Sequence, residues 1–218
     1  MKAIDSSSLR LQEAYRKLYA HFGPQFWWPA QGPFEVVVGA ILTQNTAWVN
    51  VEKAIAQLKN NKLLTPKKLY RAETRVIARL IRSCGYYNVK AQRVKNFLEV
   101  LFSEFQGKLE ILFSLSSARL RKRLLAIKGI GPETADSILL YAAGKPSFVV
   151  DAYTRRFLLR HSLIGQKADY QQIQALFTGQ LPRRMNLFNE YHALIVRLGK
   201  DFCRTKPRCG ECPLKKWK

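Results

Sequence analysis

The sequence contains no long hydrophobic run and few acidic residues. Its longest apolar run covers residues 36–42, far short of the roughly 20 residues that a membrane helix needs. Residues 1–30 carry charges throughout and lack the apolar core of a secretory signal. We therefore expect a cytoplasmic protein with no membrane contact. Against 15 acidic residues stand 37 basic ones, a formal charge of +22, which favours nucleic acid as the partner and a protein associated with the nucleoid.

Alternating β-type patterns are also lacking. Nearly every segment has the three- and four-residue spacing of apolar residues that is typical of helices. The sequence therefore predicts an all-α protein of about ten helices. They are expected near residues 8–21, 34–45, 48–60, 74–83, 89–105, 116–127, 132–143, 152–161, 169–178 and 185–202, with a further helix opening at Thr65-Pro66.

A glycine-rich turn between two predicted helices is the most informative segment. In residues 124–135, LLAIKGIGPETA, one helix stops near Lys128 and Pro132 opens the next. Between them, Gly129 and Gly131 flank Ile130. Such a turn directs free amides outward at a helix N-terminus, where an anion can bind. A helical hairpin without a ligand would have the same pattern, but the basic residues around it favour contact with DNA phosphates.

An aspartate follows the hairpin by about twenty residues. The apolar residues 148–150 precede Asp151, and a predicted helix follows it. Aspartate in this position is most often a helix N-cap.

Several motifs together resemble a known family. They are LTQNT at residues 42–46, GYYNVKA at 85–91, the hairpin, Val150-Asp151 and the terminal cysteines. Their order is similar to that of the helix-hairpin-helix DNA glycosylases of the endonuclease III-like branch, most closely its bacterial 3-methyladenine glycosylases. The resemblance implies a two-lobed all-α fold. One lobe would be a bundle over residues 33–144 containing the hairpin, and the other would join residues 1–32 to 145–218 with a C-terminal cysteine loop.

The resemblance also implies roles for individual residues. Asp151 matches the catalytic carboxylate, which would stabilise positive charge at the sugar and orient or deprotonate water. Lys128, Gly129, Ile130 and Gly131 match the phosphate-binding hairpin. Gln44 resembles the residue that enters the gap left by a flipped nucleotide, although it also fits an ordinary exposed helix end. The partner would be double-stranded DNA containing a damaged base, bound by a monomer.

Two departures from the family's pattern reduce the number of reactions that the resemblance allows. Bifunctional members carry a lysine nucleophile where this chain has Glu133. Because a carboxylate cannot form an imine, AP-lyase activity should be weak or missing. Residues 39–42, GAIL, contain no acid, which argues against the adenine-mismatch activity of other members.

The tryptophans predict a base pocket. Trp27, Trp28 and Trp48 resemble the aromatic residues that sandwich the extruded base in the 3-methyladenine glycosylases. Stacking and cation–π attraction would hold a positively charged alkylated purine. The same tryptophans also fit ordinary core packing.

The C-terminal cysteines leave the cofactor open. The family's cluster loop supplies four cysteines to a [4Fe-4S] centre, whereas this chain has Cys203, Cys209 and Cys212, with Lys218 at the fourth expected position. A cluster with another fourth ligand, a three-iron cluster, a zinc site and no metal all fit this pattern. His192 and Cys84 are possible substitutes for the missing ligand.

Three functions compete at this stage. The first is a monofunctional glycosylase that releases alkylated, 3-methyladenine-type purines in base excision repair. The second is an endonuclease III-type enzyme for oxidised pyrimidines with weak or no AP-lyase activity. The third is a non-catalytic DNA-binding module.

Overall fold

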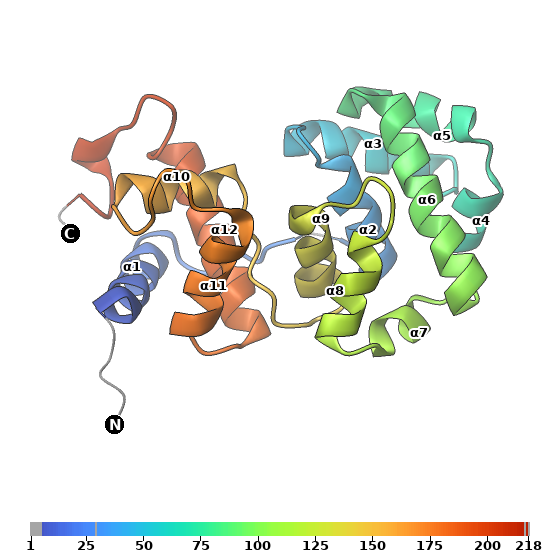
Figure 1. Ribbon diagram of the computed structural model, residues 1–218. Helices are drawn as coiled ribbons and strands as arrows, with labels where there is room; N and C mark the ends of the chain where they lie inside the picture. The colour runs from blue at the N-terminus through green and yellow to red at the C-terminus, as the bar shows by residue number, and fades with distance from the viewer. Residues whose placement is uncertain (1–5, 29, 216, 218) are drawn as a thin grey trace. The chain divides into compact units, whose positions relative to one another are not determined.

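The computed structural model describes residues 6–28, 30–215 and 217. These residues form twelve α-helices, with short 3-10 and π segments and no β-strand (Figure 1). The predicted all-α fold is therefore confirmed for them. The chain divides into two compact units: unit 1 comprises Met1–Pro29 and Pro146–Lys218, and unit 2 comprises Ala30–Lys145. In the described part of the chain, no helix has both the length and the apolar character needed to cross a membrane.

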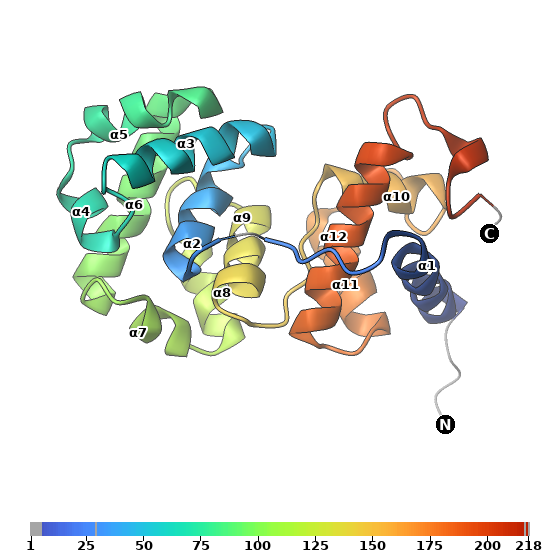
Figure 2. The same ribbon diagram turned by 180° about the vertical axis from the view of Figure 1, so that it is seen from behind.

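Unit 2 is built around a buried helix. Eight of the ten residues of α2 are buried, because its sequence is apolar on nearly every side. It packs against α3, α6, α9 and the π segment Ile138–Ala142 (Figure 2). The helices of the unit are α2 (Pro33–Leu42), α3 (Trp48–Asn60), α4 (Pro66–Arg71), α5 (Thr74–Leu80), α6 (Tyr87–Phe105), α7 (Leu109–Ser114), α8 (Ser117–Leu125) and α9 (Pro132–Ser137).

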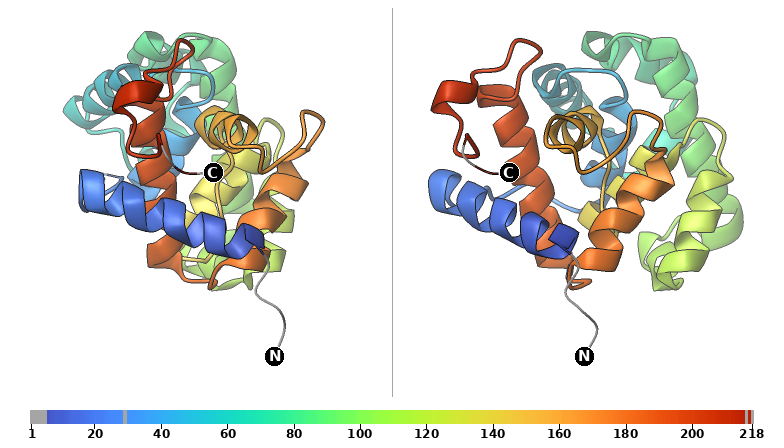
Figure 3. Two further views of the ribbon diagram at one scale, coloured as in Figure 1. Left: turned by 90° about the vertical axis from the view of Figure 1, so that its left-hand side faces the viewer. Right: turned by 60° about the vertical axis from the view of Figure 1, so that its left-hand side comes forward.

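Unit 1 joins the N-terminal helix to the C-terminal third of the chain. It contains α1 (Ser6–Phe22), α10 (Ala152–Arg160), α11 (Tyr170–Gln180) and α12 (Met185–Asp201). The helix α12 packs against α10 and α1, and α1 also contacts α11 (Figure 3). The Tyr191 hydroxyl, fully buried on α12, donates to Leu11 O on α1 at 2.8 Å, so segments 180 residues apart share one core.

Several helices begin where the sequence predicts. The Thr65 side chain accepts a hydrogen bond from Lys68 N, and Ser116 caps α8. Pro132 occupies the first turn of α9, where its missing N–H has no intrahelical acceptor.

Other boundaries differ from the predictions. The helix α7 was not predicted, because six residues are too short to show a clear period. The helix predicted over residues 34–45 ends at Leu42, since Asn45 adopts φ +52°. The helix predicted over 132–143 changes from α to π geometry at Ile138, and the one predicted over 74–83 ends at Leu80 before a 3-10 turn, Arg82–Cys84.

Candidate functional site

Asp151 caps α10 and contacts a buried histidine. Its backbone is extended, with φ −110° and ψ −175°, and its Oδ1 accepts a hydrogen bond from Thr154 N at 2.7 Å. Its Oδ2 lies 3.5 Å from His192 Nε2 on α12. The side chains are 15% and 7% exposed, respectively. The N-cap interpretation is thus correct, but the cap occupies only one carboxylate oxygen.

The surroundings of Asp151 favour its charged form. Burial raises the pKa of this carboxyl, but the neighbouring His192, 3.5 Å away, and the Thr154 amide lower it. The lowering influences prevail, so the pKa of Asp151 lies below its ordinary value of 3.8. A carboxylate in this environment is ionised at neutral pH and can stabilise a positive charge that develops beside it.

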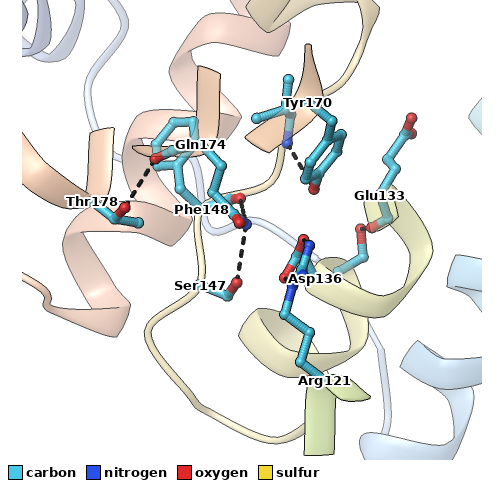
Figure 4. A network of polar contacts seen from close by, with 10 residues as sticks. Arg121, Glu133, Asp136, Ser147, Phe148, Tyr170, Gln174 and Thr178 are labelled. Carbon is cyan, nitrogen blue, oxygen red and sulfur yellow. Dashed lines mark hydrogen bonds and ion pairs between the residues drawn. The ribbon is translucent and has the colours of Figure 1, made fainter. Parts of the chain in front are cut away.

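The segment before Asp151 is anchored to α11. Gln174 Nε2 donates to Ser147 Oγ at 3.3 Å and to Phe148 O at 2.8 Å (Figure 4). The Phe148 ring stacks on Phe177 with a centroid separation of 3.6 Å. The Tyr170 hydroxyl accepts a hydrogen bond from Val150 N at 3.4 Å. These contacts fix the backbone that delivers the carboxylate to the start of α10.

The hairpin turn in unit 2 uses its two glycines differently. Gly129 has φ +96°, and a Cβ built on it would lie 2.4 Å from Arg93 Cγ, so both conformation and space require glycine. Gly131 has φ −92° and open space around a Cβ. The Ile130 amide donates to Ile127 O at 3.0 Å and its side chain is buried, whereas Lys128 is exposed.

Gln44 is tied to this hairpin. Its Nε2 donates to Gly129 O and to Thr134 Oγ1, each at 2.9 Å. Its Oε1 accepts a hydrogen bond from Arg93 of α6. The end of α2, the hairpin and α6 therefore meet at one glutamine side chain within unit 2.

A buried ion pair braces the two hairpin helices. Arg121 on α8 donates to both carboxylate oxygens of Asp136 on α9, at 2.9 and 3.0 Å (Figure 4). The Asp136 side chain is fully buried, and such two-pronged geometry is the strong form of this contact. Glu133, one turn earlier on α9, is exposed.

The three predicted pocket tryptophans lie in different units. Trp27 and Trp28 belong to unit 1 and Trp48 to unit 2. The ammonium of Lys200 lies 5.6 Å from the Trp27 ring centroid, so a cation already covers one face of that ring. Trp28 adopts φ +95°. Trp48 opens α3, and its Nε1 donates to Glu52 Oε1 at 2.8 Å.

Comparison with known proteins identifies the family. The profile of the HhH-GPD superfamily of base excision DNA repair proteins matches residues 38–183, more than half of the chain. The chain belongs to this superfamily. A Methanocaldococcus jannaschii protein, MJ1434, which is named provisionally as a DNA repair glycosylase, is 45% identical over 95% of this chain and 94% of its own length. Endonuclease III of Sulfolobus acidocaldarius is 30% identical over 84% of this chain and 79% of its own.

Two solved structures agree with the fold. The crystal structure of H. pylori 3-methyladenine DNA glycosylase (MagIII) bound to 1,N6-ethenoadenine has a TM-score of 0.73 and 31% identity, covering 89% of this chain and 97% of that one. A non-covalent endonuclease III–DNA complex has a TM-score of 0.83 and 20% identity, and the match covers 96% of this chain and 94% of that one. At this low identity, the likeness supports the fold alone. This protein is a base excision repair DNA glycosylase of the HhH-GPD superfamily, related to endonuclease III.

The cysteine loop does not fit the four-thiolate cluster that the family resemblance implies. Cys203 is buried, Cys209 is exposed and Cys212 is half-buried. In the residues that the structure describes, no three His, Cys, Asp or Glu side chains are grouped to hold a metal ion. Burial and the two neighbouring thiols raise the pKa of Cys212, although the Leu214 amide opposes them. Lys218, at the fourth expected position, lies outside the described residues.

Protein contacts hold the loop instead. Arg160 donates to Cys203 Sγ at 3.2 Å, to Arg204 O at 2.6 Å and to Thr205 O at 3.0 Å. The buried Trp217 ring stacks on Phe157 with centroids 5.6 Å apart. The three cysteines, His161 and Trp217 are among the residues that line a cavity of about 150 Å³.

Sequence reasoning missed Lys90, and it offered His192 only as a substitute metal ligand, whereas the structure places this side chain beside Asp151. Lys90 is 1% exposed, and its ammonium donates to Leu42 O at 2.9 Å, to Cys84 O at 2.8 Å and to Thr46 Oγ1. Burial is the largest influence on the pKa of Lys90 and lowers it. A lysine on the apolar face of the predicted helix, four residues before Val94, was an available signal. No signal in the sequence linked His192 to Asp151, since the two residues lie on separate predicted helices.

Proposed function

We propose that this protein is a monofunctional DNA glycosylase that flips an alkylated purine of the 3-methyladenine type out of duplex DNA and hydrolyses its glycosidic bond. The observation that carries this proposal is the position of Asp151 at the start of α10, with Oδ1 held by Thr154 N at 2.7 Å and Oδ2 3.5 Å from His192 Nε2. We assign it the role of the catalytic acid–base group.

The proposed reaction has a simple balance of atoms and electrons. The bond between the sugar C1′ and the base nitrogen breaks, and its electron pair leaves with the base. A cationic alkylated purine thereby becomes neutral, so the leaving group needs no proton. The sugar acquires oxocarbenium character, which the Asp151 carboxylate stabilises. Water then forms a bond to C1′ and gives its proton to Asp151.

The hairpin and the net charge supply DNA binding in this proposal. The exposed Lys128 and the backbone around Gly129 and Gly131 would contact phosphate, fixing the register of the protein without reading sequence. The formal charge of +22 predicts affinity that falls steeply with salt. Gln44 would enter the gap that the flipped nucleotide leaves.

The choice of an alkylated purine rests on the likeness to MagIII and on the aromatic residues. That relative, 31% identical, is named as a 3-methyladenine glycosylase and is bound to a modified adenine. Trp28 and Trp48 are the stronger candidates for stacking on a cationic base, because Lys200 already lies over one face of Trp27. A damaged base also costs the least to unstack and flip.

Endonuclease III-type activity on oxidised pyrimidines is the second candidate. The likeness to the Sulfolobus acidocaldarius endonuclease III supports it. Glu133 weighs against the strand-nicking part of that activity, because a carboxylate is not an imine-forming nucleophile.

A panel of single-lesion duplexes tests the proposal. Under single-turnover conditions, we expect release of 3-methyladenine or 7-methylguanine, without strand cleavage, and no release of thymine glycol or uracil.

The Asp151→Asn variant should release the base at least about 1,000-fold more slowly and still bind undamaged duplex. Retention of base release by Asp151→Asn would contradict the assignment of the acid. Release of thymine glycol instead would favour the endonuclease III-type alternative. Salt-sensitive binding with no base released from any duplex would leave only a DNA-binding module.

A further inference from the structure

The carboxylate of Asp151 has two partners, the Thr154 amide and the His192 ring. His192 projects from α12, and its Nε2 lies 3.5 Å from Asp151 Oδ2, while Thr154 N holds Oδ1 at 2.7 Å. The two contacts come from different helices and address different oxygens. Together they restrict both the rotation and the position of the carboxylate.

We infer that His192 is a positioning residue for Asp151, which orients the carboxylate and maintains its negative charge during base release. This inference rests on the proposed function, in which Asp151 acts on the sugar. His192 would act through Asp151 and would not touch the DNA.

The chemistry of the imidazolium ring suits this role. It donates a hydrogen bond from Nε2 toward Oδ2 and adds a positive charge that opposes protonation of the carboxylate. The ring thereby offsets part of the cost of holding an anion that is 15% exposed.

The histidine is itself held in place. Its side chain is 7% exposed, and the edge of its ring packs against Phe148 with centroids 6.4 Å apart. Phe148 belongs to the segment that Gln174 anchors at 2.8 Å. Asp151 and His192 therefore both contact or adjoin the packed segment that contains Phe148, which favours a fixed distance between the two side chains.

Several other ionisable groups on the packed elements have partners of their own. The influences on the pKa of Asp151 are burial, His192 and Thr154. Ionisable groups on α10, α11, α12 and α1 make these contacts: Arg156 with Cys203 O, Tyr170 with Val150 N, Glu190 with Gln25 N, Tyr191 with Leu11 O, and Tyr15 edge-on with Tyr191. Arg155 follows on the first turn of α10.

Titration of Asp151 tests the inference independently of activity. The carboxyl carbon of Asp151, assigned by comparison with Asp151→Asn, is followed by NMR in the wild-type protein and in His192→Gln. Glutamine retains an amide donor but cannot carry the charge. We expect the pKa of Asp151 to rise by about one unit in the variant, because burial persists while the histidine charge is gone. An unchanged pKa would overturn the inference.

Kinetics then separate positioning from a merely structural role. In His192→Gln, the acid limb of the single-turnover rate should move to higher pH, with a rate near that of wild type above it. In His192→Leu, which lacks any donor, the rate should fall about 10-fold at every pH, with unchanged affinity for undamaged duplex. His21→Gln is the matched control, because His21 is exposed on α1. Equal losses of rate and thermal stability in both variants, with an unshifted limb, would show a structural role only.

The two proposals fail in different ways. Base release by Asp151→Asn would remove the proposed function, whereas an unshifted Asp151 titration in His192→Gln would remove only the role of His192. Should His192→Leu fail to fold, the titration and the pH profile of His192→Gln still decide the question.

Discussion

Gln44 Nε2 donates a hydrogen bond at 2.9 Å to the carbonyl oxygen of Gly129, which lies 85 residues further along the chain. This bond joins two segments that the sequence assigned to different tasks, filling the DNA gap and holding phosphate. If Gln44 enters the duplex, it must release Gly129, Thr134 and Arg93. Occupation of the hairpin by DNA and the movement of Gln44 would then be coupled through this side chain.

Replacing Gln44 should therefore affect both stability and base release. We expect Gln44→Ala to lower the free energy of unfolding by about 1–2 kcal/mol, because Arg93 and Thr134 lose a partner. The single-turnover rate of base release should fall about 10-fold or more, because nothing fills the gap. Thermal unfolding and a single-turnover assay measure the two effects. Gln57→Ala, at an exposed glutamine on α3, is the control; equal rates for both variants would contradict the gap-filling role.

The two hairpin glycines should respond differently to alanine. Gly129→Ala should cost about 1–3 kcal/mol of stability, since Gly129 has φ +96° and its Cβ would meet Arg93 Cγ at 2.4 Å. Gly131→Ala should change stability by less than about 0.5 kcal/mol, because φ is −92° and nothing lies within 4 Å. Chemical denaturation measures both.

DNA binding then separates the glycines a second time. If phosphate approaches the Gly131 backbone, the added methyl of Gly131→Ala should weaken binding to undamaged duplex about 10-fold while the protein stays fully folded. Fluorescence anisotropy at two salt concentrations measures this. Full affinity in Gly131→Ala would place the phosphate elsewhere on the hairpin.

The order of the helices and the place of Asp151 at the start of a helix could be predicted from the sequence, because both depend on local patterns. The choice of Asp151 as the catalytic acid came from the family resemblance and stays a prediction. Helix α3 begins and ends where the apolar spacing predicts, and Asp151 follows an apolar triplet into a helix. Residue type and spacing determine such features directly.

Long-range contacts could not be predicted in the same way. The ammonium of Lys90 binds Leu42 O, 48 residues earlier, at 2.9 Å, and His192 meets Asp151 across two helices. Neither partner lies near the other in sequence. The change from α to π geometry at Ile138 was also beyond prediction, because the apolar pattern of residues 138–140 suits both kinds of turn.

Glu133 should determine whether the protein cleaves the DNA strand after it has released the base. We expect the wild-type protein to leave an intact abasic strand and to form no covalent adduct with borohydride, because only an amine condenses with the sugar aldehyde to an imine, losing water. Glu133→Lys should yield a trapped adduct, visible as a shifted band on a denaturing gel. Glu110→Lys, an exposed site in unit 2 with the same charge change, controls for added positive charge. Efficient trapping by the wild-type protein would contradict the assignment.

Trp217 should stabilise the cysteine loop without help from a metal. The ring is 5% exposed, stacks on Phe157 at 5.6 Å, and has the Arg10 guanidinium 5.3 Å from its centroid. We expect Trp217→Ala to lower the free energy of unfolding by about 3 kcal/mol, which corresponds to a fall in Tm of about 6–12 °C.

Cys209→Ser should leave Tm unchanged within about 1 °C, because Cys209 is exposed, and a chelator should also have no effect. Iron or zinc at one equivalent per chain, together with a lower Tm in Cys209→Ser, would instead make the loop a metal site. Trp217→Ala and Cys209→Ser change the same loop. A lower Tm in the first variant alone would show that packing of the ring stabilises the loop, and not metal binding by the thiol.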